Sequence, residues 1–215
     1  MIVRCRIAIV TAALAALAGC KSSGDIVVDQ SIGITALRTA CPAVGIPDYT
    51  GDVTLFRGDE RTAEAIDVVA VITNVRSQCD DTGEKVYSTA TFDVLARRTD
   101  TRGPRTVELP YFSVVLRGGN AVVSKQVGTV TVNFADGQER AQATGTAGAY
   151  IDRAAATLPP DIVERINRQR RPGDEDAAID PLTLPEVRTA LSRANFELLM
   201  GFQLSESQLA YNATR

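Results

Sequence analysis

Histidine and tryptophan are both absent from the 215 residues of the chain. Without histidine the chain cannot build a Ser-His-Asp or Cys-His catalytic arrangement. It also lacks the residue that most often binds zinc and copper in proteins. We therefore expect a protein that is not an enzyme and that has no metal site and no cofactor.

Long hydrophobic runs are absent as well. The run from Ile7 to Ala18 spans twelve residues and is apolar apart from one threonine, whereas a membrane-spanning helix needs about 20 apolar residues. Arg4 and Arg6 precede this run, and small residues end it. This order is typical of a secretory signal peptide, so we expect residues 1–19 to be one.

The end of the apolar run carries a more specific pattern. Leu17-Ala18-Gly19-Cys20 resembles the lipobox of bacterial lipoproteins. The resemblance implies that the Cys20 thiol is joined to a diacylglyceryl group, that cleavage occurs before Cys20, and that the new amine is acylated. Two or three acyl chains make a stable membrane anchor, whereas one chain binds only marginally. The alternative is an ordinary signal peptide that leaves Cys20 unmodified.

The residue after Cys20 bears on location. In well-studied bacteria with two membranes, aspartate at this place retains a lipoprotein in the inner membrane, and here the residue is Lys21. The resemblance therefore implies a lipid anchor in the outer membrane, on its periplasmic side, with the inner membrane as the alternative. Residues 20–31 would be the lipidated cysteine and a tether.

Four cysteines are present, and the signal peptide and the lipid would account for Cys5 and Cys20. Cys41 and Cys79 then remain, and in an oxidising compartment we expect them to form a disulfide. The alternative is a pair of buried free thiols. No C-x-x-C motif occurs, so a redox-active pair is not expected.

The charge of the chain gives no support to a nucleic-acid partner. Removal of the first 19 residues would take two arginines and no acid from the formal charge of −3, which leaves −5. Nucleic-acid-binding domains usually carry a basic excess instead. The expected partners are the membrane, through Cys20, and an envelope protein or a second copy of the chain.

Between Asp52 and Asp152 the sequence predicts β-structure. Apolar residues recur at period two between turn signals such as Gly118-Gly119-Asn120, which favours an antiparallel β-sandwich of about seven strands over residues 32–157. The strand 65–75 carries apolar residues on both faces, which predicts burial on both. Pro110 predicts an edge strand or a bulge. The expected strands are 52–56, 65–75, 86–97, 106–117, 121–134 and 140–151.

Two of these strands carry an architectural resemblance. VITN at 71–74, followed by TATFDVLAR at 89–97, is similar to immunoglobulin-like or fibronectin-like domains of envelope lipoproteins. The resemblance implies an immunoglobulin-like sandwich, and a fold of this kind does not by itself imply a function.

The region 158–215 is expected to be helical, which gives two or three α-helices in all. Pro159-Pro160 favours a helix over 161–171, and a polar linker follows near 172–182. An apolar stripe predicts a second helix over 183–200. Ser205 and Gln208 have the spacing of a capping box for a last short helix.

The most apolar part of this region supplies the candidate partner-binding residues. These are Phe196, Leu199, Met200 and Phe202, and the alternative is that they dock on the chain's own sandwich. The leading hypothesis is a non-enzymatic outer-membrane lipoprotein that acts as an interaction or assembly module. The alternative is a carrier of a small hydrophobic ligand or lipid, and a third hypothesis is an enzyme with a carboxylate-based site.

Overall fold

The computed structural model describes residues 39–168, 173–174 and 176–215. The chain divides into two compact units, of which one comprises residues 1–34 and 168–178 and the other residues 35–167 and 179–215. Of the first unit, the described residues include an ion pair between Arg168 and Asp176. The predicted signal peptide, Cys20 and the tether lie outside the described residues. The fold described below is that of the second unit.

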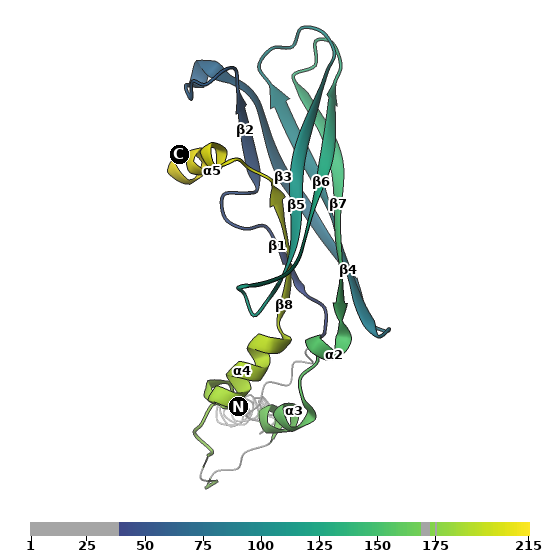
Figure 1. Cartoon of the computed structure of the whole chain (residues 1–215), viewed down its shortest axis with the longest axis vertical. Coiled ribbons are helices and arrows are strands. Elements are labelled where there is room, and N and C mark those ends of the chain that lie inside the picture. The colour runs from purple at the N-terminus through teal and green to yellow at the C-terminus, as the bar shows by residue number, and fades with distance from the viewer. Residues whose placement is uncertain (1–38, 169–172, 175) are drawn as a thin grey trace, which may run out of the picture. The chain divides into compact units, whose positions relative to one another are not determined.

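Eight strands of the described residues form two four-stranded sheets (Figure 1). The first sheet has the order β1-β8-β5-β6 and the second the order β2-β3-β4-β7. All neighbours are antiparallel except β1 and β8, which are parallel. The strands are β1 Ala43–Gly45, β2 Asp52–Phe56, β3 Ile66–Asp80, β4 Lys85–Arg98, β5 Arg105–Arg117, β6 Ala121–Phe134, β7 Arg140–Asp152 and β8 Phe196–Phe202.

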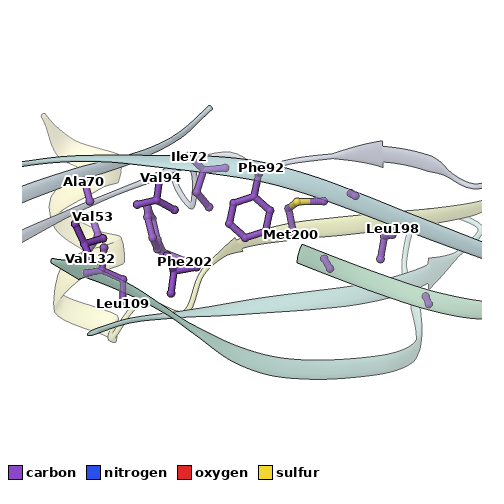
Figure 2. Close-up of a cluster of buried hydrophobic side chains, with 14 of the residues drawn as sticks. Val53, Ala70, Ile72, Phe92, Val94, Leu109, Val132, Leu198, Met200 and Phe202 are labelled. Carbon is purple, nitrogen blue, oxygen red and sulfur yellow. The ribbon is translucent and has the colours of Figure 1, made fainter. Parts of the chain in front are cut away.

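The sequence alternation explains these strands. Every second residue of β4 from Val86 to Arg98 is buried, and the residues between them are exposed or half-buried. Because successive side chains of a strand point to opposite faces, this alternation puts one face of β4 in the core and the other in solvent. Figure 2 shows Phe92 and Val94 of β4 together with Met200 and Phe202 in one buried cluster.

The predicted mainly β architecture is confirmed, and the two sheets are arranged as in a β-sandwich around one core. β2 and β6 begin and end at the predicted residues, and β3 continues to Asp80, five residues beyond the prediction. The immunoglobulin-like order of strands is not confirmed, since β2, β3 and β4 are consecutive neighbours in one sheet with β7 beside them.

The predicted helix over 183–200 is wrong in its last third. Helix α4 spans Pro185–Ala194 and is followed by strand β8. β8 lies between β1 and β5, and Leu198 and Met200 in it are fully buried. Burial in the middle of a sheet has overridden the helix propensity of its leucine and methionine residues.

The edge position predicted from Pro110 holds for only half of its strand. β6 pairs with β5 along its whole length, whereas β8 pairs with β5 only from Tyr111 to Arg117. Pro110 stands one residue outside that second pairing. Its missing N–H therefore removes no hydrogen bond from the β5–β8 ladder.

The helices are short and follow the last strands of the sandwich (Figure 1). They are α2 Arg153–Ala156, α3 Pro160–Asn167, α4 Pro185–Ala194 and α5 Glu206–Thr214, with single 3₁₀ turns at Ala63–Ala65 and Pro181–Thr183. Ile162, Ile166 and Val187 form a small separate core between α3 and α4. The predicted capping box of the last helix is confirmed, because the Ser205 and Gln208 side chains each bond the other residue's backbone.

The C-terminal helix α5 is fixed to β2. The Asn212 side chain donates hydrogen bonds of 2.8 Å to the carbonyl oxygens of Tyr49 and Asp52. The Tyr211 ring meets the Phe56 ring edge-on at 5.1 Å. These contacts join residues about 160 positions apart in the sequence, so the chain end covers one strand of the second sheet.

Aromatic rings packed on glycines fill the space between the sheets. Phe92 lies over Gly145, its partner on β7, and an added β-carbon at Gly145 would be 2.3 Å from the ring. Tyr111 covers Gly128 on β6 in the same way. The Tyr111 hydroxyl then crosses to the second sheet and donates to the Thr146 carbonyl at 2.6 Å. Both glycines are therefore needed because a ring occupies the place of their side chains.

A buried arginine closes one end of the sandwich. Arg98 ends β4 with its side chain 1% exposed. Its guanidinium donates to four carbonyl oxygens at 2.8–2.9 Å. These carbonyls belong to Thr101 and Gly103 after β4 and to Ala135 and Gln138 after β6. The Arg98 side chain thus links the loop between β4 and β5 to the loop between β6 and β7.

The predicted disulfide between Cys41 and Cys79 is present, with a Cα–Cα distance of 6.1 Å. Cys41 lies two residues before β1 of the first sheet, and Cys79 lies in β3 of the second. The Thr39 hydroxyl donates to the Asp81 carboxylate at 3.2 Å beside it. The disulfide therefore links the two sheets where the chain enters the sandwich.

Candidate functional site

The strongest candidate surface is the outer face of the second sheet, which is the side of β3, β4 and β7 that points away from the core. Large apolar side chains are exposed there although the alternation of a half-buried strand predicts polar ones. Along this face the paired residues of β4 and β7 are Arg97 and Arg140, Leu95 and Gln142, Asp93 and Thr144, Thr91 and Thr146, Thr89 and Gly148, and Tyr87 and Tyr150.

One end of this face is an open groove of about 620 Å³. Val71 and Leu95, which are paired across β3 and β4, are 42% and 43% exposed. Val69 is half-buried beside them. The prediction that β3 is covered on both faces is therefore wrong at Val71. The polar residues that line the groove are Arg97, Gln138, Arg140 and Gln142.

Arginine side chains border the apolar floor of the groove. Arg97 pairs with Glu139 at 2.5 Å, and both side chains are largely exposed. For Arg140, its neighbour on β7, no ion pair is found among the described residues. Arg215 does not line the groove; it forms an ion pair with Asp52, the β2 partner of Val71. The groove thus offers an apolar floor and at least one guanidinium that can bind an anion.

A fixed carboxylate lies in the middle of the outer face. Asp93 accepts a hydrogen bond of 2.8 Å from the Asn74 amide and one of 3.2 Å from the Thr144 hydroxyl. The Asn74 hydrogen bond is the main reason why the pKa of Asp93 lies below its usual value. Asn74 reaches it from an irregularity in the β3–β4 pairing, where its φ is +51°. Bulges of this kind often redirect a side chain beside a binding site.

A pair of stacked tyrosines ends the outer face. Tyr87 and Tyr150 are cross-strand partners, with ring centroids 4.5 Å apart and an interplanar angle of 27°. They remain 41% and 67% exposed. Gly148 precedes Tyr150 on the same face, and a β-carbon added there would lie 3.7 Å from the Tyr87 hydroxyl oxygen. The stack contributes to sheet stability, and it also presents aromatic rings to solvent.

A second group of exposed apolar residues lies on β6, an edge strand of the first sheet. Val122, Val123 and Val127 are 65%, 55% and 61% exposed. Lys125 stands between them over the Phe112 ring. A lysine on an exposed edge strand disfavours pairing with another chain. We therefore do not assign a docking site to this edge.

The predicted partner-binding residues lie elsewhere. Phe196, Met200 and Phe202 are at most 6% exposed and belong to the sandwich core, while Leu199 is half-buried in the same strand. Their apolar character is explained by the alternative, docking on the chain's own sandwich, because β8 is a central strand. A partner could reach Phe196, Met200 and Phe202 only if β8 left the sheet.

The outer face was missed at the sequence level, although the sequence contains a signal for it. Once Val86, Phe92 and Val94 are assigned to the core, the residues between them must face solvent. Tyr87 and Leu95 fall on that solvent side of β4. Apolar residues out of phase with the core are the pattern that marks this surface.

Nowhere in the described part of the chain do three or more histidine, cysteine, aspartate or glutamate side chains come together as a metal site requires. None of the described helices combines the length and the apolar character that a membrane crossing requires. No family model, no curated protein and no solved structure matches the chain.

Proposed function

We propose that this protein is a non-enzymatic interaction module, held on the periplasmic side of the outer membrane by a lipid anchor at Cys20. Its partner docks on the outer face of the second sheet. The resemblance to immunoglobulin-like domains supports only the architecture: the outer faces of two packed sheets are open to a partner. The lipobox and Lys21 support the anchor and its location.

One observation carries the docking role. Val71 and Leu95 form an exposed apolar floor, and Arg97 and Arg140 border it. Exposing two large apolar side chains to water gains nothing for the monomer, because their burial would contribute about 25 cal/mol per Å². A partner that covers the groove would gain this free energy and could also place an anionic group beside Arg140.

Two further features favour a non-catalytic module. Hydrogen bonds from neighbouring side chains lower the pKa values of four carboxyl groups, those of Asp67, Asp80, Asp93 and Asp100. A carboxyl that acts as a general acid near neutral pH needs its pKa raised instead. In addition, Phe92, Met200 and Phe202 fill the space between the sheets (Figure 2), which disfavours a carrier with its ligand in that space.

The anchor is tested by replacing Cys20. We expect Cys20→Ala to abolish incorporation of labelled fatty acid and to move the protein from the membrane fraction to the soluble fraction, because no acyl chain remains to hold it. Lys21→Asp is the matched control: it should keep the label and shift the protein toward the inner membrane. Continued membrane attachment of Cys20→Ala would contradict the anchor.

The docking role is tested by photocrosslinking in the native envelope. A benzophenone amino acid at Thr146, in the middle of the outer face, should give crosslinks that depend on the groove. Val71→Thr with Leu95→Thr should reduce them strongly, because threonine is itself well suited to a strand but removes apolar contact.

The matched control places the same probe at Val123 on the opposite sheet, where the groove substitutions should change nothing. Thermal unfolding of the double variant should stay close to that of the wild type, since both replaced side chains are over 40% exposed. Equal crosslinking at Thr146 and Val123 would contradict the proposed docking surface.

A further inference from the structure

We propose that the partner bound by the outer face is a glycan chain that bears carboxylate groups. This inference rests on the proposed function, because it names the chemistry of the partner at the same surface. Three parts of the face support it: the exposed tyrosine pair, the hydroxyl-rich middle and the arginine pair. They follow one another along β4 and β7.

The tyrosine end suits a sugar ring. The apolar C–H face of a pyranose packs on an aromatic ring, and tyrosine adds a hydroxyl that can bond to the sugar. Tyr150 is 67% exposed and is held by its stack on Tyr87. A ring that is already fixed loses little conformational freedom when a ligand binds.

The middle of the face offers hydrogen-bonding groups and almost no apolar surface. Thr144 is the cross-strand partner of Asp93, the pair Thr91 and Thr146 follows it on the same face, and Thr89 lies one position further along that face. Asp93 is held in place by the hydrogen bonds from Asn74 and Thr144, and a charged acceptor makes stronger hydrogen bonds to hydroxyl groups than a neutral one. Sugars present many hydroxyl groups, so this surface matches their chemistry.

The opposite end suits a carboxylate. Arg97 and Arg140 are cross-strand neighbours, and Glu139 pairs only with the first of them among the described residues. A guanidinium binds a carboxylate with two parallel hydrogen bonds. From Tyr87 to Arg97 the strand spans roughly 34 Å at about 3.4 Å per residue. An extended chain carrying both sugars and carboxylates can therefore contact all three parts.

A protein partner fits the middle of this face less well than its two ends, where tyrosine and arginine are residue types common at protein interfaces. Serine, threonine and valine are under-represented among the residues that dominate protein–protein binding energy, and the middle of the outer face consists mostly of threonine and glycine. Its floor is also a sheet surface without a deep pocket for an aromatic anchor. The observations therefore favour a glycan, and a protein partner becomes one outcome of the test.

The experiment measures binding of the full-length protein, extracted in detergent, to three insoluble probes. Purified peptidoglycan sacculi carry sugars and carboxylates, chitin carries sugars alone, and immobilised polyglutamate carries carboxylates alone. We expect the strongest retention on sacculi. Tyr150→Ala should weaken it about ten-fold, as loss of a stacking contact worth about 1.4 kcal/mol predicts. Arg140→Gln should weaken it several-fold and abolish its salt dependence.

Two conservative variants serve as controls. Tyr150→Phe keeps the aromatic face and should retain most of the binding. Arg188→Gln removes an exposed arginine on α4 and should leave binding unchanged. Sacculus binding that is absent, or that is equal in wild type, Tyr150→Ala and Arg140→Gln, would overturn the glycan.

The crosslinking experiment at Thr146 separates this failure from failure of the docking role. Groove-dependent crosslinks to a protein, together with no sacculus binding, would overturn the glycan and leave the interaction module intact. Loss of both signals would overturn both. Crosslinks to carbohydrate that Tyr150→Ala removes would support the glycan and the docking surface together.

Discussion

Replacing Arg98 with methionine is expected to lower the free energy of unfolding by about 4 kcal/mol. Methionine keeps much of the apolar volume of the side chain but makes none of its four hydrogen bonds. The carbonyl oxygens after β4 and β6 then lose their shared donor at a site where Arg98 is 1% exposed. Equilibrium unfolding in urea measures the loss.

The cost is expected to be large because the guanidinium has no substitute. Its plane also lies over the Phe134 ring, with 5.2 Å between its central carbon and the ring centroid. Arg98→Lys should recover only part of the loss, since one ammonium group cannot reach carbonyls on both loops with the geometry of a planar fork. A lysine variant as stable as the wild type would show that the charge matters and the fork does not.

Arg97→Met is the matched control, because it changes the neighbouring residue of the same strand on the opposite face. Its ion pair with Glu139 is exposed at both ends, and such pairs contribute at most about 1 kcal/mol. The two substitutions should therefore differ by about 3 kcal/mol or more. Equal effects of Arg98→Met and Arg97→Met would contradict the role assigned to the buried side chain.

The sequence pattern of β4 predicts that Arg98 is buried, but it does not predict the hydrogen bonds that stabilise it. Alternation from Val86 through Phe92 and Val94 to Ala96 identifies the core face of β4. Arg98 is the next residue on that face, two positions further along the chain. A period-two pattern thus predicts that Arg98 points inward. The sequence could not predict the four acceptors, because they come from two loops that only the folded chain brings together.

β8 shows where local patterns fail. The apolar stripe that runs through α4 continues to Leu198, so the sequence predicts one uninterrupted helix. Asn195 ends α4 in an extended conformation, and the next seven residues fill the slot between β1 and β5. That slot is defined by strands about 80 and 150 residues earlier in the chain, and no local window contains it.

The candidate site also depends partly on local sequence pattern and partly on long-range strand pairing. The outward positions of Tyr87 and Leu95 follow from alternation within one strand, whereas their neighbours Tyr150 and Gln142 follow from the pairing of β4 with β7. β5 and β6 separate these two strands in the sequence. A surface built from non-consecutive strands is therefore visible in the sequence only as single residues out of phase.

Removing the disulfide by the double substitution Cys41→Ser and Cys79→Ser is expected to lower the free energy of unfolding by about 4 kcal/mol. The two cysteines are 38 positions apart. On the chain-entropy model a closed loop of this length restricts the unfolded chain by about that amount. The denaturant dependence of the free energy should also become steeper, because an unfolded chain without the link exposes more surface.

The native fold should survive the double substitution. Cys79 is exposed near the end of β3, and the parallel pairing of β1 with β8 still holds the entering chain to the first sheet. The loss is therefore expected to arise mainly in the unfolded state, where the link no longer limits the distance between residues 41 and 79. Near-ultraviolet circular dichroism at low denaturant should stay unchanged.

Reduction of the wild-type protein provides the matched control. Dithiothreitol should bring its unfolding midpoint to that of the double variant and should leave the variant itself unchanged. A wild type that resists this shift after complete reduction would contradict a stabilising link. The same experiment separates the disulfide from the nearby Thr39–Asp81 contact, since that hydrogen bond does not depend on the redox state of the thiols.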